Sequence, residues 1–331
     1  MRGYLFRRML SVVPTLLGIT LVTFLLLEIL PGREMALSQA SGASLPSRET
    51  LERLRETYHL NEPIPTRYLH WLLRLCRWDL GESLLDHRPV SQTLRQTAGR
   101  TLTLNLLALS LALAISVPLG TRWAAAAGTL RERIGSLLLY LLYAFPGFAA
   151  ALILQYLFAV RWGVLPLQGV RSLPDSAPLL PRSLDLAAHL LLPVLCLAYG
   201  SLAYLARFTR ASVLEGLHSH YVDAARARGV DERALVWRHA FRNALVPMAT
   251  LLGALVPALL GGSILVETIF SWPGIGRLYF ESLQNRDYPV VLALTVVTAL
   301  LTLAGSLLAD VLYCFADPRV EPEQGFHGRV S

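Results

Sequence analysis

The sequence contains no lysine, because all 30 of its basic residues are arginine. A Walker A loop needs a lysine to reach the β and γ phosphates of a bound nucleotide, so the chain is not a conventional P-loop ATPase. It also has no HExxH motif, no GxSxG motif and no Cys/His spacing suited to a metal. We therefore expect no catalytic residue, no cofactor site and no metal site in this chain.

Cysteine is scarce as well, with three residues at Cys76, Cys196 and Cys314. Their wide separation indicates neither a disulfide nor a CxxC metal pair. The formal net charge is +7 and the pI is about 9.6. Basic chains often bind nucleic acid, but these arginines gather at the ends of apolar runs, which predicts no nucleic-acid partner.

Long apolar runs dominate the chain, which is 54% hydrophobic and has a mean hydropathy of +0.48. A helix needs about 20 consecutive apolar residues to cross a bilayer core about 30 Å thick. The sequence thus predicts an all-α, polytopic membrane protein with about six transmembrane helices. The first run also resembles a signal peptide, but it exceeds the roughly 7 to 15 apolar residues of one, which favours a retained helix. The expected spans are residues 9–30, 101–120, 134–160, 184–205, 244–266 and 289–315.

The distribution of arginine predicts the orientation, because short cytoplasmic loops are enriched in positive charge. Seven arginines lie in residues 207–242, and three lie in each of the amino terminus and residues 122–133. Both termini are therefore expected in the cytoplasm. The resulting division is an amino-terminal transmembrane helix (1–30), an extracytoplasmic helical loop (31–100), a core (101–316) with a cytoplasmic loop (207–242), and a cytoplasmic tail (317–331).

Two amphipathic helices are expected in the extracytoplasmic loop, at residues 47–59 and 68–78. The first has apolar side chains at helical spacing among arginine and glutamate, and the second has apolar and aromatic side chains among arginines. Tyr68, Trp71 and Trp78 suit the headgroup level of a membrane. These helices either pack on the spans or form a surface for a partner protein.

The loop before the fifth span is expected to fold as helix, stop, helix. Ala224 and Ala225 favour a helix and let another surface approach the backbone closely. Gly229 is suited to ending that helix in the left-handed conformation, and Asp231 is suited to capping the next one. Taken alone, this pattern also fits an ordinary helical hairpin or a DNA-reading helix-turn-helix.

Asp223-Ala-Ala, three residues and then Gly229 resembles the EAA-x3-G signature of bacterial ABC importer permeases. The resemblance implies a coupling helix that docks on a separate ATPase subunit. Asp223 stands where glutamate is commoner. The usual Ile-x-Leu-Pro is replaced by a segment from His239 to Pro247 that resembles the peptide and nickel importer branch. The implied coupling residues are Asp223, Ala224, Ala225, Arg228, Gly229, Val230 and Asp231, with His239, Arg242 and Asn243 supporting the loop against the spans.

The resemblance extends along nearly the whole chain. It includes the segment from Val266 to Arg277, Asn285-Arg-Asp-Tyr-Pro-Val290, and Ala316-Asp-Pro-Arg319. From the residues themselves, Pro273 fixes φ and Gly274 is free to take a positive φ, so we expect a tight re-entrant turn. Its aromatic residues either anchor the turn at the interface or close the outer mouth of a pathway. The candidate residues of this turn are Phe270, Trp272, Pro273, Gly274 and Gly276.

The resemblance implies a permease subunit in a bacterial inner membrane, in contact with membrane lipid, that forms half of a pathway for di- or oligopeptides. Its implied partners are a second permease, two ATPase subunits or a fused pair that bind ATP and Mg, and an extracytoplasmic substrate-binding protein. Nickel or another small solute remains an alternative substrate. An ion-coupled secondary transporter and a membrane sensor or scaffold are the alternative classes of protein.

Ion-coupled carriers usually hold an ionisable residue near the middle of the membrane. The candidates here, Glu28, His189 and Asp310, all lie near the ends of expected spans. Glu28 is expected to extend outward and Asp310 inward, which disfavours ion coupling. Asn105 is expected to form a hydrogen bond between helices.

Overall fold

The computed structural model describes residues 2–29, 62–261 and 263–316. Within these ranges the chain is helical, with one isolated bridge between Glu82 and Pro89 and no longer strand. The all-α prediction is therefore confirmed. The helix expected at residues 47–59 and the tail at 317–331 lie outside the described residues.

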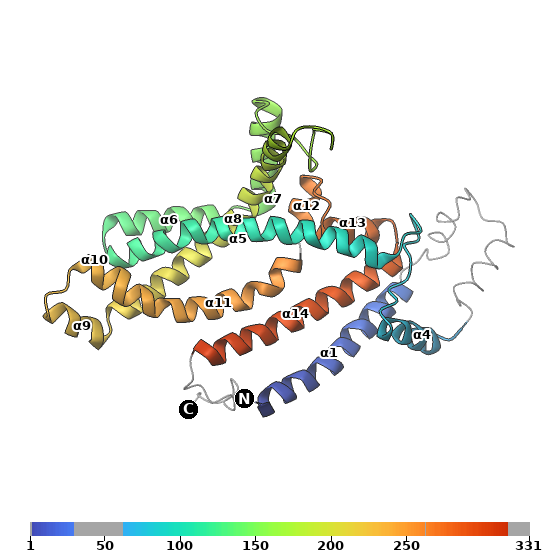
Figure 1. Ribbon diagram of the computed structural model, residues 1–331, viewed down its shortest axis with the longest axis horizontal. Helices are drawn as coiled ribbons and strands as arrows, with labels where there is room; N and C mark the ends of the chain where they lie inside the picture. Colours follow the sequence, from blue (N-terminus) through green and yellow to red (C-terminus); the bar gives the residue numbers. More distant parts are fainter. Residues whose placement is uncertain (1, 30–61, 262, 317–331) are drawn as a thin grey trace.

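Among the residues that the structure describes, five helices are long and apolar enough to cross a membrane. They are α1 (Arg2–Ile29), α5 (Val90–Ala125), α8 (Leu179–Leu217), α11 (Phe241–Gly261) and α14 (Tyr288–Ala316). Figure 1 shows α1, α5, α11 and α14 extending along the long axis of the molecule. α5 begins at Val90, inside the segment that we expected to be an extracytoplasmic loop, so the second helix extends well beyond its apolar run.

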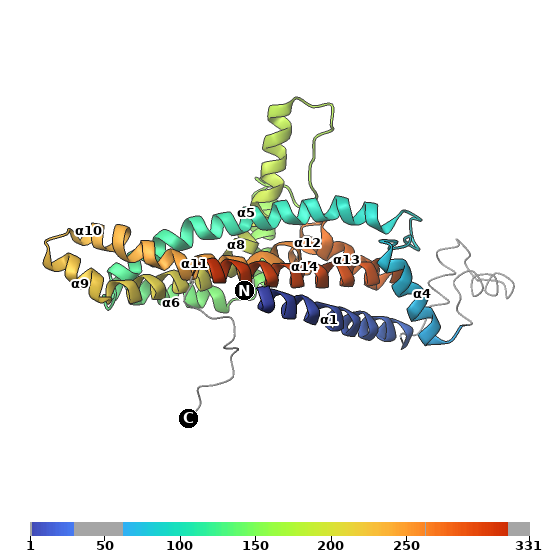
Figure 2. The same ribbon diagram turned by 60° about the horizontal axis from the view of Figure 1, so that its bottom comes forward.

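The third expected span, at residues 134–160, is broken rather than continuous. α6 (Leu130–Ala144) and α7 (Gly147–Gln155), which continues into η1 (Tyr156–Arg161), meet at an angle of 87°. Pro146 causes the break, because proline lacks an N–H and forces the preceding Phe145 into an extended conformation, with φ −78° and ψ 130°. The described residues contain up to six candidate spans if the bent pair counts as one. Figure 2 shows the beginning of α8 projecting from the side of the bundle beside this break.

The most extensive contact between two described helices is that of α5 with α8, and small residues contribute to it. A Cβ atom at Gly120 would lie 2.4 Å from the carbonyl oxygen of Ala206 and 2.8 Å from the Cβ of Thr209. Without a side chain at Gly120, the two backbones approach each other directly. Leu104, Ala108 and Leu205 are buried in the same contact, and α11 packs against α14 beside it.

The two ends of the bundle carry different structures. At one end lie α9 (His220–Ala227), α10 (Glu232–Ala234) and η2 (Leu235–Ala240) (Figure 1). At the other lie α4 (Ile64–Cys76) and α13 (Ile275–Gln284). α4 confirms the second expected amphipathic helix, although Trp78 lies beyond its end with a φ of 58°. Tyr68 and Trp71 of α4 pack on Phe24 of α1, and α1 in turn lies against α14.

Candidate functional site

The first candidate site is the coupling segment, which we define as residues 220–240 and which comprises α9, α10 and η2. α9 ends at Ala227, and Gly229 follows with a φ of 81°. The Val230 N–H donates to the carbonyl of Ala225 and the Gly229 N–H donates to that of Arg226, at 3.3 and 3.0 Å. This pair of hydrogen bonds is a Schellman motif, which confirms the expected stop.

Asp231 then starts the next helix, because its carboxylate accepts a hydrogen bond from the Arg233 N–H at 3.1 Å. Arg226 connects the two helices. Its guanidinium donates to the carboxylate of Asp223 at 2.9 Å and to that of Glu232 at 3.1 Å. The sequence did not predict this role for Arg226, because its bridge between two helices depends on the turn that brings Glu232 back toward α9.

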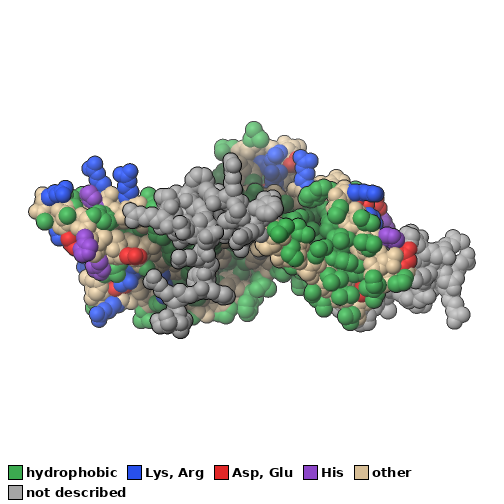
Figure 3. All heavy atoms as spheres, turned by 90° about the horizontal axis from the view of Figure 1, so that it is seen from below, with side chains coloured by type: hydrophobic (Ala, Val, Ile, Leu, Met, Phe, Trp, Pro, Cys, Tyr) green, Lys and Arg blue, Asp and Glu red, His purple; other side chains and the backbone are tan. Residues whose placement is uncertain are grey.

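The implied docking residues form an exposed tip. Asp223, Ala224, Arg228, Gly229 and Asp231 are all exposed, and Ala225 and Val230 are half-buried. Arginine and histidine side chains gather at this end of the molecule (Figure 3). This arrangement leaves the small side chains of α9 accessible to a second protein while Arg226 holds the shape of the tip.

Apolar side chains attach the tip to the spans. Val222 and Leu235 are fully buried, at 0% exposure, and Ala240 packs on α8, where a Cβ at Gly216 would lie 3.1 Å from the Ala240 carbonyl. The expected supporting residues are less involved. The His239 carbonyl accepts a hydrogen bond from the Tyr221 hydroxyl at 3.4 Å, whereas Arg242 and Asn243 are exposed.

The second candidate site is the turn between α12 (Ile264–Ile269) and α13, at the other end of α5. Phe270 and Trp272 are buried, with exposed fractions of 3% and 2%. The Trp272 indole N–H donates to the carbonyl of Arg100 at 3.2 Å. The two aromatic residues are therefore part of the packed core of this chain and do not act as exposed anchors at the interface.

A buried carboxylate organises this turn. Glu267 has 0% exposure, and its Oε1 accepts a hydrogen bond from the Thr101 hydroxyl at 3.0 Å. Its Oε2 accepts another from the Arg277 N–H, also at 3.0 Å. The Thr101 oxygen accepts from the Ile275 N–H at 2.8 Å, so one network joins α5, α12 and α13. Burial raises the pKa of Glu267, and these hydrogen bonds oppose the shift only in part.

Gly274 and Gly276 are required by space rather than by backbone conformation. We expected a positive φ at Gly274, but its φ is −105° with ψ −175°, which is extended, and Ser271 takes the left-handed conformation instead, with a φ of 51°. A Cβ at Gly274 would lie 2.4 Å from the Thr101 Oγ1 and 2.5 Å from the Glu267 Oε2. A Cβ at Gly276 would lie 2.8 Å from the Ile264 nitrogen.

Our sequence analysis missed Glu267 and Thr101 as site residues. Glu267 is a single acidic residue between the apolar runs Ile264–Val266 and Ile269–Phe270, and this was the available signal. Thr101 carries no such signal, because a threonine in an apolar helix commonly bonds to its own backbone.

A similar buried carboxyl lies at the start of α14. Asp287 is 2% exposed and accepts hydrogen bonds from the Ser83 hydroxyl at 2.5 Å and from the Leu84 N–H at 3.0 Å. Burial raises the pKa of Asp287 as well. The Asp287 carboxyl thus holds the segment that follows α4 against the first turn of α14.

Three further polar residues that we considered also have defined partners. Glu28 is paired with Arg67 of α4, and both side chains are largely buried, so Glu28 does not simply extend outward. His189 is buried beside Asp185, at 3.4 Å between Nδ1 and Oδ1, and its Nε2 lies 3.3 Å from the Ser172 hydroxyl. The Asn105 amide donates to the carbonyl of Leu259 at 2.6 Å, which confirms the expected bond between helices.

Comparison with known proteins connects these features. The family model described as "Binding-protein-dependent transport system inner membrane component" matches residues 116–322, and the amino-terminal model of such components matches residues 1–105. The oligopeptide transport system permease protein AppB of Bacillus subtilis is 37% identical over 97% of this chain and 100% of its own length. The dipeptide transport system permease protein DppB of Escherichia coli is 34% identical over 97% of this chain and 99% of its own length.

The fold is that of an ABC transporter permease. A chain of the MetNI methionine ABC transporter in an inward-facing conformation superposes with a TM-score of 0.50 at 16% identity, covering 68% of this chain and 98% of that one. The sequence matches over the full length identify the family of this chain. The chain belongs to the family of binding-protein-dependent transport system inner membrane components, and it is a transmembrane permease subunit of an ABC importer.

Proposed function

We propose that this chain forms half of the translocation pathway of an importer for di- or oligopeptides, and that the coupling segment docks on separate ATPase subunits. The observation that carries the proposal is the tip at α9, where exposed small residues are held in a fixed shape by the Schellman motif and by the bridge from Arg226. A docking helix must be both accessible and rigidly attached, and this segment meets both requirements.

In this proposal the coupling segment and both termini face the cytoplasm, while α4 and the α12–α13 turn face outward. The seven arginines of residues 207–242 support this orientation. Residues 31–100 then form the outer domain, except that α5 already begins at Val90, and residues 317–331 form a cytoplasmic tail.

ATP and Mg would be bound by the partner ATPases, either two chains or a fused pair. When these close on ATP, α9 would move with them, and the buried contacts of Val222 and Leu235 would transmit the movement to α8 and α11. A second permease subunit would supply the other half of the pathway, and a substrate-binding protein would deliver substrate from outside.

Peptide is the proposed substrate because relatives that match over their full lengths are named as oligopeptide and dipeptide permeases. Nickel or another small solute is the alternative within the same class. A secondary transporter is less well supported, because Glu28 and His189 are engaged with Arg67 and Asp185, which leaves neither available as a simple ion-coupling group.

The experiment is purification of the chain from its native membrane in mild detergent, with mass spectrometry of the proteins that remain bound. We expect ATPase subunits, a second permease and a binding protein. The binding protein is then tested by calorimetry against a dipeptide, an oligopeptide and Ni²⁺, which distinguishes the alternative substrates. Repeated recovery of the intact chain alone, with uptake driven by an ion gradient and not by ATP, would reject the proposal.

A further inference from the structure

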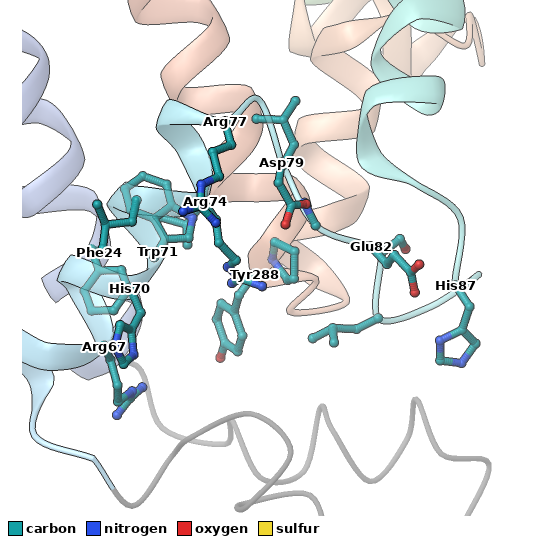
Figure 4. A pocket seen from close by; sticks show the side chains of 17 residues that line it. Phe24, Arg67, His70, Trp71, Arg74, Arg77, Asp79, Glu82, His87 and Tyr288 are labelled. Carbon is teal, nitrogen blue, oxygen red and sulfur yellow. The ribbon is translucent and has the colours of Figure 1, made fainter.

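A cavity of about 710 Å³ lies at the end of the bundle opposite the coupling segment (Figure 4). Its walls come from α1, α4, the segment after α4 and the first turn of α14. A volume in this range fits a small molecule or a lipid headgroup and is too small for a folded protein.

One wall of the cavity is apolar. It consists of Phe24, Trp71, Leu84 and Leu292, with the Tyr288 ring beside them. Phe24 lies near the end of the α1 span, and Tyr288 is the first residue of the α14 span. The cavity is therefore located where the apolar layer of the bundle ends, which is the level of lipid headgroups.

The other wall is charged. Arg74, Arg77, His70 and His87 line it, against Asp79 and Glu82. Figure 4 shows the side chains of Arg74 and Arg77 extending from α4 and its end toward the space beside Tyr288. In the described part of the chain neither arginine side chain forms an ion pair or a hydrogen bond, whereas Arg67, nearby on α4, is paired with Glu28. Asp79 and Glu82 balance the formal charge of Arg74 and Arg77, but both guanidinium groups have no partner among the described residues and so are available to bind an anion.

The surface next to the cavity suits acyl chains. Leu69 and Leu73 of α4 are each 53% exposed, and Leu21 and Ile29 of α1 are 41% and 78% exposed. These apolar side chains lie on the two helices that form the cavity. A ligand with a phosphate in the cavity therefore has an apolar surface beside it for a hydrocarbon tail.

We propose that this cavity binds the headgroup of an anionic phospholipid, with the phosphate held by Arg74 and Arg77 and the acyl chains lying along α1 and α4. Guanidinium groups form paired, charge-assisted hydrogen bonds with phosphate oxygens, which neutral headgroup components do not match. A free phosphate would use the same two arginines but would leave the apolar wall uncovered. The site does not depend on which leaflet the cavity faces.

The test uses the assembled complex in nanodiscs of phosphatidylcholine that contain increasing phosphatidylglycerol, with retained lipid counted by native mass spectrometry. We expect phosphatidylglycerol to be retained in preference to phosphatidylcholine. The double variant Arg74→Gln/Arg77→Gln should retain it roughly tenfold more weakly, since each lost charge-assisted bond weakens binding by a measurable factor. Both arginines are exposed, so the fold should tolerate the change.

Three controls make the result decisive. Arg88→Gln removes an exposed arginine that lies outside the cavity, beside Asp86, and should leave retention unchanged. Arg74→Lys/Arg77→Lys keeps the charge and should retain more lipid than the glutamine pair. Excess inorganic phosphate should not displace the lipid. Equal retention by the parent and the glutamine pair would overturn the site, and full displacement by inorganic phosphate would show a free-anion site instead.

Discussion

The Thr101 hydroxyl donates a hydrogen bond to the Glu267 carboxylate at 3.0 Å, and this contact joins α5 to the turn before α13. Neither group reaches water, because both residues have 0% exposure. A buried polar pair of this kind is costly to disrupt, since each group left behind has no alternative partner. This hydrogen bond therefore fixes the turn to the bundle, and a change in the shape of the turn would disrupt it.

Gly274→Ala should destabilise the protein by about 1–3 kcal/mol, the usual cost of inserting an atom into a packed core. The added methyl group would lie 2.4 Å from the Thr101 oxygen, so the network must move. The measurement is the thermal unfolding midpoint in detergent. Gly200→Ala is the matched control, because nothing lies within 4 Å of a Cβ at Gly200. Equal midpoints for the two variants would contradict the packing argument.

The free energy of unfolding should fall as pH rises, because of the buried carboxyls of Glu267 and Asp287. Burial raises the pKa of both carboxyls above the values that they have in the unfolded chain. The folded state therefore holds protons that the unfolded state releases, and this contribution is complete at acid pH and is lost as pH rises through the folded pKa. Arg277, Glu281 and Asp86 are the neighbouring charged residues.

The double variant Glu267→Gln/Asp287→Asn removes both titrations. Its stability relative to the parent should improve steadily between acid and neutral pH, measured by denaturant unfolding at each pH. A constant difference between parent and double variant across the range would refute the assignment.

Features that depend on the preferences of single residues could be predicted from the sequence. The glycine stop at Gly229, the cap at Asp231 and the interhelical bond of Asn105 all follow from residue types whose preferences are strong and local. The amphipathic α4 was predictable for the same reason, because its pattern is complete within 13 residues.

Contacts between distant segments were not predictable. Thr101 and Glu267 are far apart in sequence, and only the packing of α13 against α5 brings them together. The extended φ of Gly274 was missed for the same reason, since its glycine is required by neighbouring atoms and not by the turn itself. The bend of 87° at Pro146 was not predicted either, because residues 134–160 form one apolar run and a proline within it does not fix an angle.

Gly229→Val should uncouple transport while leaving membrane insertion intact. Gly229 has a φ of 81°, a conformation that costs a residue with a side chain roughly 1–2 kcal/mol and a β-branched one at least as much. The Schellman bonds that fix the end of α9 would then weaken. The measurement is ATP-dependent uptake by the reconstituted complex, alongside the amount of assembled complex.

Gly128→Val is the matched control for Gly229→Val, because Gly128 has a φ of 83° but lies in the short turn between α5 and α6, outside the coupling segment. Any loss from backbone strain alone should appear in both variants. Normal uptake by assembled Gly229→Val complex would show that the end of α9 is not part of the coupling mechanism.

Replacing one partner of the buried pair between Glu28 and Arg67 should destabilise the protein more than replacing both. The two side chains are 10% and 11% exposed, so a single change leaves an uncompensated charge in a largely dry site. We expect Arg67→Met to destabilise by about 3–5 kcal/mol, and Arg67→Met/Glu28→Leu to recover much of that loss, because replacing both ions with apolar groups removes the desolvation penalty. The measurement is thermal unfolding in one detergent of the parent, the two single variants and the double variant, which together form a double-mutant cycle. If the double variant were as unstable as the sum of the two single changes, the pair would contribute nothing as a pair. In that case α4 would be held to α1 by the aromatic contacts of Phe24 and by the hydrogen bonds of the Tyr68 hydroxyl with Thr20 and Leu17.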